Sequence, residues 1–125
     1  MNVVDSSGWL EYFSDGRNAS YFAAPLKAEE TLVVPVISIY EVFKVLLREA
    51  GEDAALQAAL AMQRAHAVVE LTPQLALSAA SLSLAHSLPM ADSIILASAR
   101  AYKATIWTQD IDFKGIDNVQ YFPKK

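Results

Sequence analysis

The chain of 125 residues contains no cysteine, only two histidines, and fewer basic than acidic residues. Without cysteine, disulfides, thiolate zinc sites and a cysteine nucleophile are all excluded. His66 and His86 leave little basis for a histidine-based metal site. Ten basic residues against fourteen acids give a net charge of −4. A surface that binds nucleic acid by positive charge alone is therefore not expected, and such chemistry would need a local device such as a bound divalent cation.

Long uncharged runs are also scarce, and residues 71–91 are the exception, with no Asp, Glu, Lys or Arg. Because Pro73, Pro89 and several polar side chains interrupt this run, we expect a buried amphipathic helix there rather than a membrane span. The N-terminus lacks the basic flank and apolar run of a signal sequence. We expect a cytoplasmic protein without membrane association, and the length and 54% hydrophobic content predict one domain over residues 1–125.

Short β-branched runs alternate with helical patterns along the chain, which predicts an α/β fold with a parallel sheet and helices on both faces. The expected strands are 1–5, 32–36, 68–71, 105–108 and 119–122. The expected helices are 6–14, 18–28, 39–50, 53–66, 73–87 and 91–102, with a turn or short helix at 110–115. Ser6 or Ser7 is expected to cap the first helix, and Thr72 the fifth. Gly51 is expected to stop the helix 39–50.

Four acids lie where these elements meet. Asp5 follows the first strand and Asp110 follows the strand 105–108, while Glu41 and Asp92 lie in the first turns of helices. Because the carboxyl ends of parallel strands meet at one edge of a sheet, we expect Asp5, Glu41 and Asp110 to lie there together. Connectivity does not place Asp92, because its helix follows another helix.

Each acid also has a structural interpretation. Ser38 and Glu41 match the S-x-x-E capping box, and Asp92 lies where the helix macrodipole favours a negative charge. Asp110 and Asp112 are suited to capping a short helix.

For Asp5, a turn residue and a functional acid are about equally supported. Four converging carboxylates, however, repel one another and lose hydration, which costs free energy unless a counter-charge is present. Mg²⁺ or Mn²⁺ supplies that charge and prefers oxygen ligands, so the four acids together favour a metal site.

Three segments carry a resemblance to a known family and cover nearly the whole chain, from Asn2 to about Phe122. Their order and the spacing of their acids resemble the successive motifs of PIN-domain ribonucleases, and most closely those of the VapC-type toxins of bacterial toxin–antitoxin pairs. The segments are VVDSSGWLEYFSDG, VPVISIYEVFKVL and PMADSIILASARAYKATIWTQDIDF.

The resemblance implies a three-layer α/β fold with about five mainly parallel strands between helices. It implies a metal-dependent endoribonuclease in which Mg²⁺ or Mn²⁺ activates water for hydrolysis of RNA phosphodiester bonds, with a small cognate antitoxin and a homodimer as partners. It assigns the catalytic and metal-binding roles to Asp5, Glu41, Asp92 and Asp110. Hydroxyls and one further acid would support that site: Ser6, Ser7, Thr108 and Asp112.

Other interpretations of the sequence remain beside this one. A PIN-like fold without catalysis would act as a binding module that sequesters a partner. A groove between residues 7–14 and 39–50 is a candidate seat for an antitoxin segment, although the same apolar residues also suit a plain core. Basic side chains on helices expected near the site would add contacts to RNA or would simply be solvated surface charges: Lys44, Arg48, Arg100 and Lys103.

Overall fold

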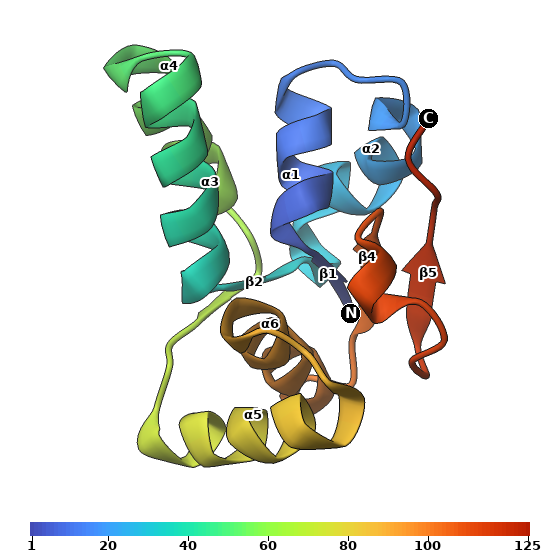
Figure 1. Ribbon diagram of the computed structural model, residues 1–125. Coiled ribbons are helices and arrows are strands. Elements are labelled where there is room, and N and C mark those ends of the chain that lie inside the picture. The colour runs from blue at the N-terminus through green and yellow to red at the C-terminus, as the bar shows by residue number, and fades with distance from the viewer.

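The computed structural model describes residues 1–125 and shows five short parallel strands between two groups of helices (Figure 1). The strands are β1 (Asn2–Val4), β2 (Val33–Pro35), β3 (Ala67–Val69), β4 (Thr105–Thr108) and β5 (Val119–Tyr121). The α-helices are α1 (Ser6–Phe13), α2 (Ala19–Lys27), α3 (Val36–Glu49), α4 (Glu52–Met62), α5 (Pro73–His86) and α6 (Met90–Ala101). Two 3₁₀ turns complete the fold, η1 (Glu29–Thr31) and η2 (Ile111–Phe113).

All strand pairings are parallel, as the alternation of strands and helices predicts. One sheet has the order β1-β4-β5, and a second sheet pairs β2 with β3. A single parallel bridge between Asn2 and Leu32 joins the two sheets. The carboxyl ends of β1, β2 and β4 therefore lie at one edge of the strand layer, where ligands bind in open parallel folds.

Side-chain alternation along the strands places a core on each face of this layer. Val3 and Val33 pack in one core with Ile95 of α6, whereas their neighbours Val4 and Val34 pack in the other core, beneath α1 to α4. Figure 1 shows the same division, with α5 and α6 on one side of the strands and the four earlier helices on the other. The predicted α/β fold with helices on both faces is confirmed.

The predicted start of α3 is wrong by one turn. Pro35 ends β2 in an extended conformation, and the helix begins directly after it, at Val36 rather than at Ile39. Ser38 therefore lies inside the first turn, fully buried, and its Oγ has no hydrogen-bond partner. The predicted capping box of Ser38 and Glu41 does not form, because a residue inside the helix is not in the N-cap position. The predicted stop at Gly51 is confirmed, since this residue adopts a φ of 95° directly after α3 ends.

Two predictions for the middle of the chain also need correction. The helix expected over 53–66 ends at Met62, and the chain then turns before β3. α5 was expected to be buried, yet only Ala79 of this helix is fully enclosed, while Leu77 and Leu84 are 73% and 88% exposed. No single helix is long and apolar enough to cross a membrane, and the one pair that passes by length and composition, α5 with α6, is bent by 114°.

Candidate metal centre at the carboxyl edge of the strands

Asp5 is the most enclosed acid of the site, with 2% of its surface exposed. It directly follows β1 and caps α1, because its Oδ1 accepts a hydrogen bond from the Gly8 backbone N–H at 3.0 Å. The prediction that Ser6 or Ser7 caps this helix is therefore wrong. Ser7 Oγ instead donates to Asp5 Oδ1 at 2.8 Å, and Thr108 Oγ1 donates to Asp5 Oδ2 at 2.7 Å. Three donors from two elements thus fix both carboxylate oxygens.

Gly8 was not predicted to matter, although it stands in the D-S-S-G-W segment on which the resemblance rests. A Cβ at this position would lie 2.5 Å from Val4 Cγ1 and 2.9 Å from the Phe22 ring. Only glycine lets the first turn of α1 approach β1 so closely, and this approach aims the Gly8 N–H at Asp5. A glycine three residues after a strand-end acid is the sequence signal for such a contact.

Asp110 is coupled to Asp5 through Thr108. The Asp110 N–H donates to Thr108 Oγ1 at 2.8 Å, and the same hydroxyl donates to Asp5. The Asp110 side chain accepts from the Asp112 N–H at 2.9 Å and caps η2, as its structural interpretation anticipated. This cap uses one carboxylate oxygen of Asp110 and leaves the other free of protein donors.

Asp92 is the acid that connectivity did not place, and the structure brings it to this edge. It lies in the first turn of α6, where the helix dipole favours negative charge. One carboxylate oxygen from each of Asp92, Asp110 and Asp112 lies within 4.8 Å of the others, and Asp112 is the exposed member. Three oxygen donors at such a spacing suit a hard divalent cation, which fits the chemistry of this donor set.

Glu41 approaches the cluster from α3. Ser6 Oγ donates to Glu41 Oε1 at 2.7 Å. Ser6 therefore orients Glu41, whereas its neighbour Ser7 orients Asp5. Burial is the main cause that raises the pKa of Asp92, and the charges of Asp110, Asp5 and Glu41 raise it further, in that order. The close group of carboxylates thus contains Asp92 and Asp110 together with Asp112, for which the sequence predicts only a supporting role. Asp5 and Glu41 lie outside that group and act on Asp92 through their charges, and the capping interpretation of Glu41 fails.

Burial and mutual repulsion disfavour the charged forms of two of these acids. Loss of hydration raises the pKa of Asp5 from its usual 3.8 to about 6, although its hydrogen bonds from Thr108, Ser7 and Gly8 act in the opposite direction. Loss of hydration, followed by repulsion from Asp110, raises the pKa of Asp92 to about 7. Burial is the largest cause of both shifts, and repulsion from neighbouring acids adds to it.

The metal-free protein is therefore expected to lose stability as pH rises. Folded Asp5 and Asp92 release their protons near pH 6 and 7, whereas the unfolded chain releases them near 3.8, so raising the pH across this window favours unfolding. Urea titrations in EDTA at about pH 4.5 and about pH 8 should give a smaller free energy of unfolding at the higher value. Asp92→Asn should reduce this difference, and an unchanged difference would contradict the assigned environment of Asp92.

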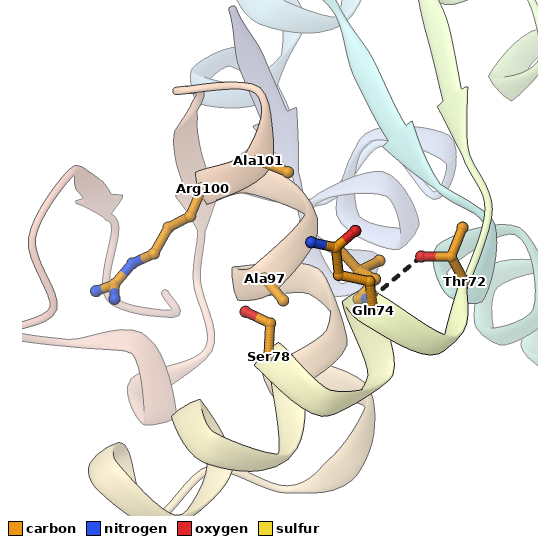
Figure 2. Close-up of a pocket in the computed structure, with 7 residues that line it drawn as sticks. Thr72, Gln74, Ser78, Ala97, Arg100 and Ala101 are labelled. Carbon is orange, nitrogen blue, oxygen red and sulfur yellow. Dashed lines mark hydrogen bonds between the residues drawn. The ribbon is translucent and has the colours of Figure 1, made fainter.

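Basic side chains do not neutralise the cluster. The ion pairs in the protein join Arg48 to Glu49 and Arg64 to Glu29, and neither involves a site acid. Arg100 and Lys103 are exposed at and beyond the C-terminal end of α6, whereas Asp92 lies at its start, which favours the alternative that these two are solvated surface charges. Arg100 instead borders a separate hollow of about 500 Å³ between α5 and α6, with Thr72 and Gln74 (Figure 2).

The parallel α/β layer with carboxylates gathered at its carboxyl edge could hold a metal ion there, and comparison gives the family. The chain belongs to the PIN domain family, whose model matches residues 3–119. No curated protein matches the chain in sequence.

Solved structures share this fold over nearly the full chain. A toxin–antitoxin complex from Klebsiella pneumoniae is 20% identical, with a TM-score of 0.82 and coverage of 98% of this chain and 99% of that one. VapC20 from Mycobacterium tuberculosis, a toxin that cleaves the sarcin–ricin loop, is 19% identical, with a TM-score of 0.79 and coverage of 98% and 100%. VapBC2 from Rickettsia felis, bound to a promoter DNA fragment, is 15% identical, with a TM-score of 0.71 and coverage of 99% and 98%.

Proposed function

We propose that this single-domain protein is a metal-dependent endoribonuclease of the VapC type, which acts in the cytoplasm and is inhibited by a small cognate antitoxin. The observation that carries the proposal is the group of Asp92, Asp110 and Asp112, whose carboxylate oxygens lie within 4.8 Å of one another and form no ion pair with a basic side chain. Asp5, which is linked to Asp110 through Thr108, and Glu41 would complete this site. Such a cluster needs a cation, and a cation in an acidic pocket gives an acidic protein a local attraction for RNA phosphates. Membership of the PIN domain family and the likeness to VapC20 support the same activity.

The chain's own residues have distinct tasks in this reaction. Mg²⁺ or Mn²⁺ bound at these oxygens would lower the pKa of a coordinated water and neutralise charge that develops on the phosphodiester. Ser7 and Thr108 hold Asp5 in one orientation, and Ser6 does the same for Glu41. Fixed ligand carboxylates reduce the reorganisation that the transition state requires.

A catalytically silent binding module is the alternative, and metal separates the two functions. We expect purified protein to cut RNA with saturating Mg²⁺ or Mn²⁺ and to leave it intact in EDTA. The metal should also raise the melting temperature, because a ligand at 100 times its dissociation constant stabilises the folded state by about 2.7 kcal/mol.

The Asp92→Asn variant serves as the control for this experiment, because the rise in its melting temperature should be smaller. A melting curve that does not respond to saturating metal would refute the metal site. Metal binding without RNA cleavage would favour the binding module instead.

The antitoxin is proposed to bind beside the acidic edge. A hollow of about 270 Å³ lies between α1 and α3, the two helices whose apolar residues suggested a groove. Leu10 and Leu46 offer it apolar surface, while Ser7 connects it to the site through its hydrogen bond with Asp5. A peptide in this hollow would thus lie next to the catalytic acids. The Klebsiella pneumoniae and Rickettsia felis relatives were crystallised as toxin–antitoxin assemblies, which supports a partner of this kind.

The proposed homodimer has a candidate face on α5. Leu77 and Leu84 stand seven residues apart on this helix and are 73% and 88% exposed, within the stretch 71–91 that carries no charged side chain. A two-fold interface sets the same patch against itself, so an uncharged patch avoids repulsion between two acidic chains. Leu84→Glu should shift the protein towards the monomer in sedimentation velocity, whereas Leu60→Glu, at an exposed position of α4, should not. A monomeric parent protein would exclude this interface.

A further inference from the structure

Gln109 lies between two residues of the candidate site, but its side chain bonds to none of the site acids. Thr108 and Asp110 turn towards Asp5, as their hydrogen bonds show. The side chain of Gln109 instead forms its hydrogen bonds with Asn18 and Glu11, neither of which belongs to the candidate site. Gln109 is buried, with 8% of its surface exposed, and a buried amide requires hydrogen-bond partners.

Those partners form a closed ring with Gln109. Its Oε1 accepts from Asn18 Nδ2 at 3.0 Å, and its Nε2 donates to Glu11 Oε1 at 3.4 Å. Glu11 Oε2 closes the ring by accepting from the Asn18 backbone N–H at 2.8 Å. The ring therefore ties the segment after β4 to α1, which begins directly after Asp5, and to the start of α2.

The C-terminal segment forms hydrogen bonds with Asn18 of the ring and with Thr108. Asn18 Nδ2 also donates to the Pro123 carbonyl at 3.0 Å, and the Phe122 N–H donates to the Thr108 carbonyl at 2.9 Å. Figure 1 shows the C-terminus beside α2. The chain between Thr108 and Asp110 is thus also held by contacts with the C-terminal segment.

Stability alone does not explain this ring. Asn18 is fully buried and its Oδ1 has no hydrogen-bond partner, and an unpaired buried acceptor costs free energy that an apolar side chain would avoid. The hydrogen bonds that such a buried network does form rigidify the groups that they join. What they orient here is the segment that carries Asp110.

We propose that Glu11, Asn18 and Gln109 form a positioning network that sets the place of Thr108 and Asp110 relative to Asp5. The inference deepens the proposed metal-dependent cleavage and rests on it for its kinetic consequences. None of the three residues touches RNA or metal in this assignment. They act by holding the backbone of residues 108–110, so their loss should lower kcat and metal affinity and leave KM for RNA unchanged.

Three variants test the network, with Mn²⁺ titrated in the absence of RNA as the first measurement. Gln109→Met keeps the length of the side chain and removes both hydrogen bonds. Gln109→Glu keeps the acceptor for Asn18 but sets a carboxylate against Glu11. Glu11→Gln combined with Gln109→Glu restores a donor and an acceptor at each place with the same net charge as the parent. Gln120→Met is the matched control, because Gln120 is exposed on β5.

We expect Gln109→Met and Gln109→Glu to weaken Mn²⁺ binding and lower kcat by roughly 10- to 100-fold, the usual effect of losing a residue that orients a metal ligand. The double variant should recover most of the loss, because the interaction energy of a double-mutant cycle reports the direct pair. Gln120→Met should behave as the parent. Thermal melting of each variant shows whether it folds.

The two proposals fail separately. Weaker Mn²⁺ binding in Gln109→Met and rescue by the double variant, without RNA cleavage by the parent, would refute the ribonuclease and support the network. Normal cleavage and Mn²⁺ binding by the folded Gln109 variants would refute the network and retain the ribonuclease. Failure of the double variant to recover, or a parent that binds no metal, would also overturn the positioning role.

Discussion

Asp5→Asn is expected to abolish RNA cleavage and to leave the metal-free protein at least as stable as the parent at neutral pH. Asparagine caps a helix about as well as aspartate, so the hydrogen bond from the Gly8 N–H can persist. The substitution removes a buried negative charge whose pKa burial has already raised to about 6. Near pH 7 the parent must keep this group ionised against that cost, whereas the amide is neutral at every pH.

The activity of Asp5→Asn should vanish for the same electrostatic reason. An amide oxygen is a weaker ligand for a hard cation than a carboxylate, and it cannot neutralise positive charge. Cleavage of total RNA at saturating Mg²⁺ and melting in EDTA measure the two effects separately.

Asp15→Asn is the matched control for Asp5→Asn. Asp15 is exposed and has a φ of 55°, which asparagine adopts readily, so this variant should cleave and melt as the parent does. If Asp5→Asn instead unfolds, Asp5 is a structural residue and the site must be assigned without it.

The sequence predicts helices on both faces of the strands, because the pattern that indicates this arrangement lies within each strand. Val3 and Val4 are both apolar, as are Val33 and Val34, and such pairs suit a strand that is covered on both faces. The structure divides each pair between the two cores. The acids that follow the strands are equally visible, because parallel pairing alone brings strand ends to one edge.

The start of α3 was misassigned because two local signals agreed on the wrong residue. Val36 and Ile37 are β-branched and continue the apolar strand pattern, while Ser38 and Glu41 match a capping motif. The chain enters the helix directly after Pro35, and the serine is enclosed by tertiary packing. Tertiary packing overrides the low helix propensity of β-branched residues, because that propensity is worth well under 1 kcal/mol per residue.

Local patterns and connectivity do not predict the contacts between residues that lie far apart in the sequence. The resemblance assigns Asp92 to the site, but connectivity does not place it there, because Asp92 reaches this edge through the packing of α6 against the strands. Asn18 and Gln109 are 91 positions apart; Asn18 lies outside the segments that carry the resemblance, and Gln109 lies inside one of them with no role assigned to it. The exposed face of α5 was misjudged for a related reason: absence of charge predicts burial, but α5 packs on α6 along one side only, around Ala79.

Glu41→Gln is expected to fold as the parent does and to lose cleavage by on the order of a hundredfold or more, if its charge supports the metal-bound transition state. Glutamine retains an oxygen that can accept the 2.7 Å hydrogen bond from Ser6, so the substitution removes the charge and little else. A capping role predicted the opposite outcome, because glutamine serves a capping box as well as glutamate. The structure contains no capping box that would make Glu41→Gln neutral, since Ser38 lies within α3 and its Oγ has no hydrogen-bond partner.

Two controls separate the charge of Glu41 from its surroundings. Ser38→Ala should leave cleavage intact and should not cost the roughly 1 kcal/mol expected from loss of a cap, because it deletes a buried hydroxyl that has no partner. Ser6→Ala keeps the charge but frees the carboxylate, so its loss of kcat should be smaller than that of Glu41→Gln. Single-turnover cleavage at saturating Mg²⁺ ranks the three variants. If Glu41→Gln cleaves RNA as fast as the parent, the catalytic cluster contains only aspartates, and Ser6 orients a side chain that the reaction does not use.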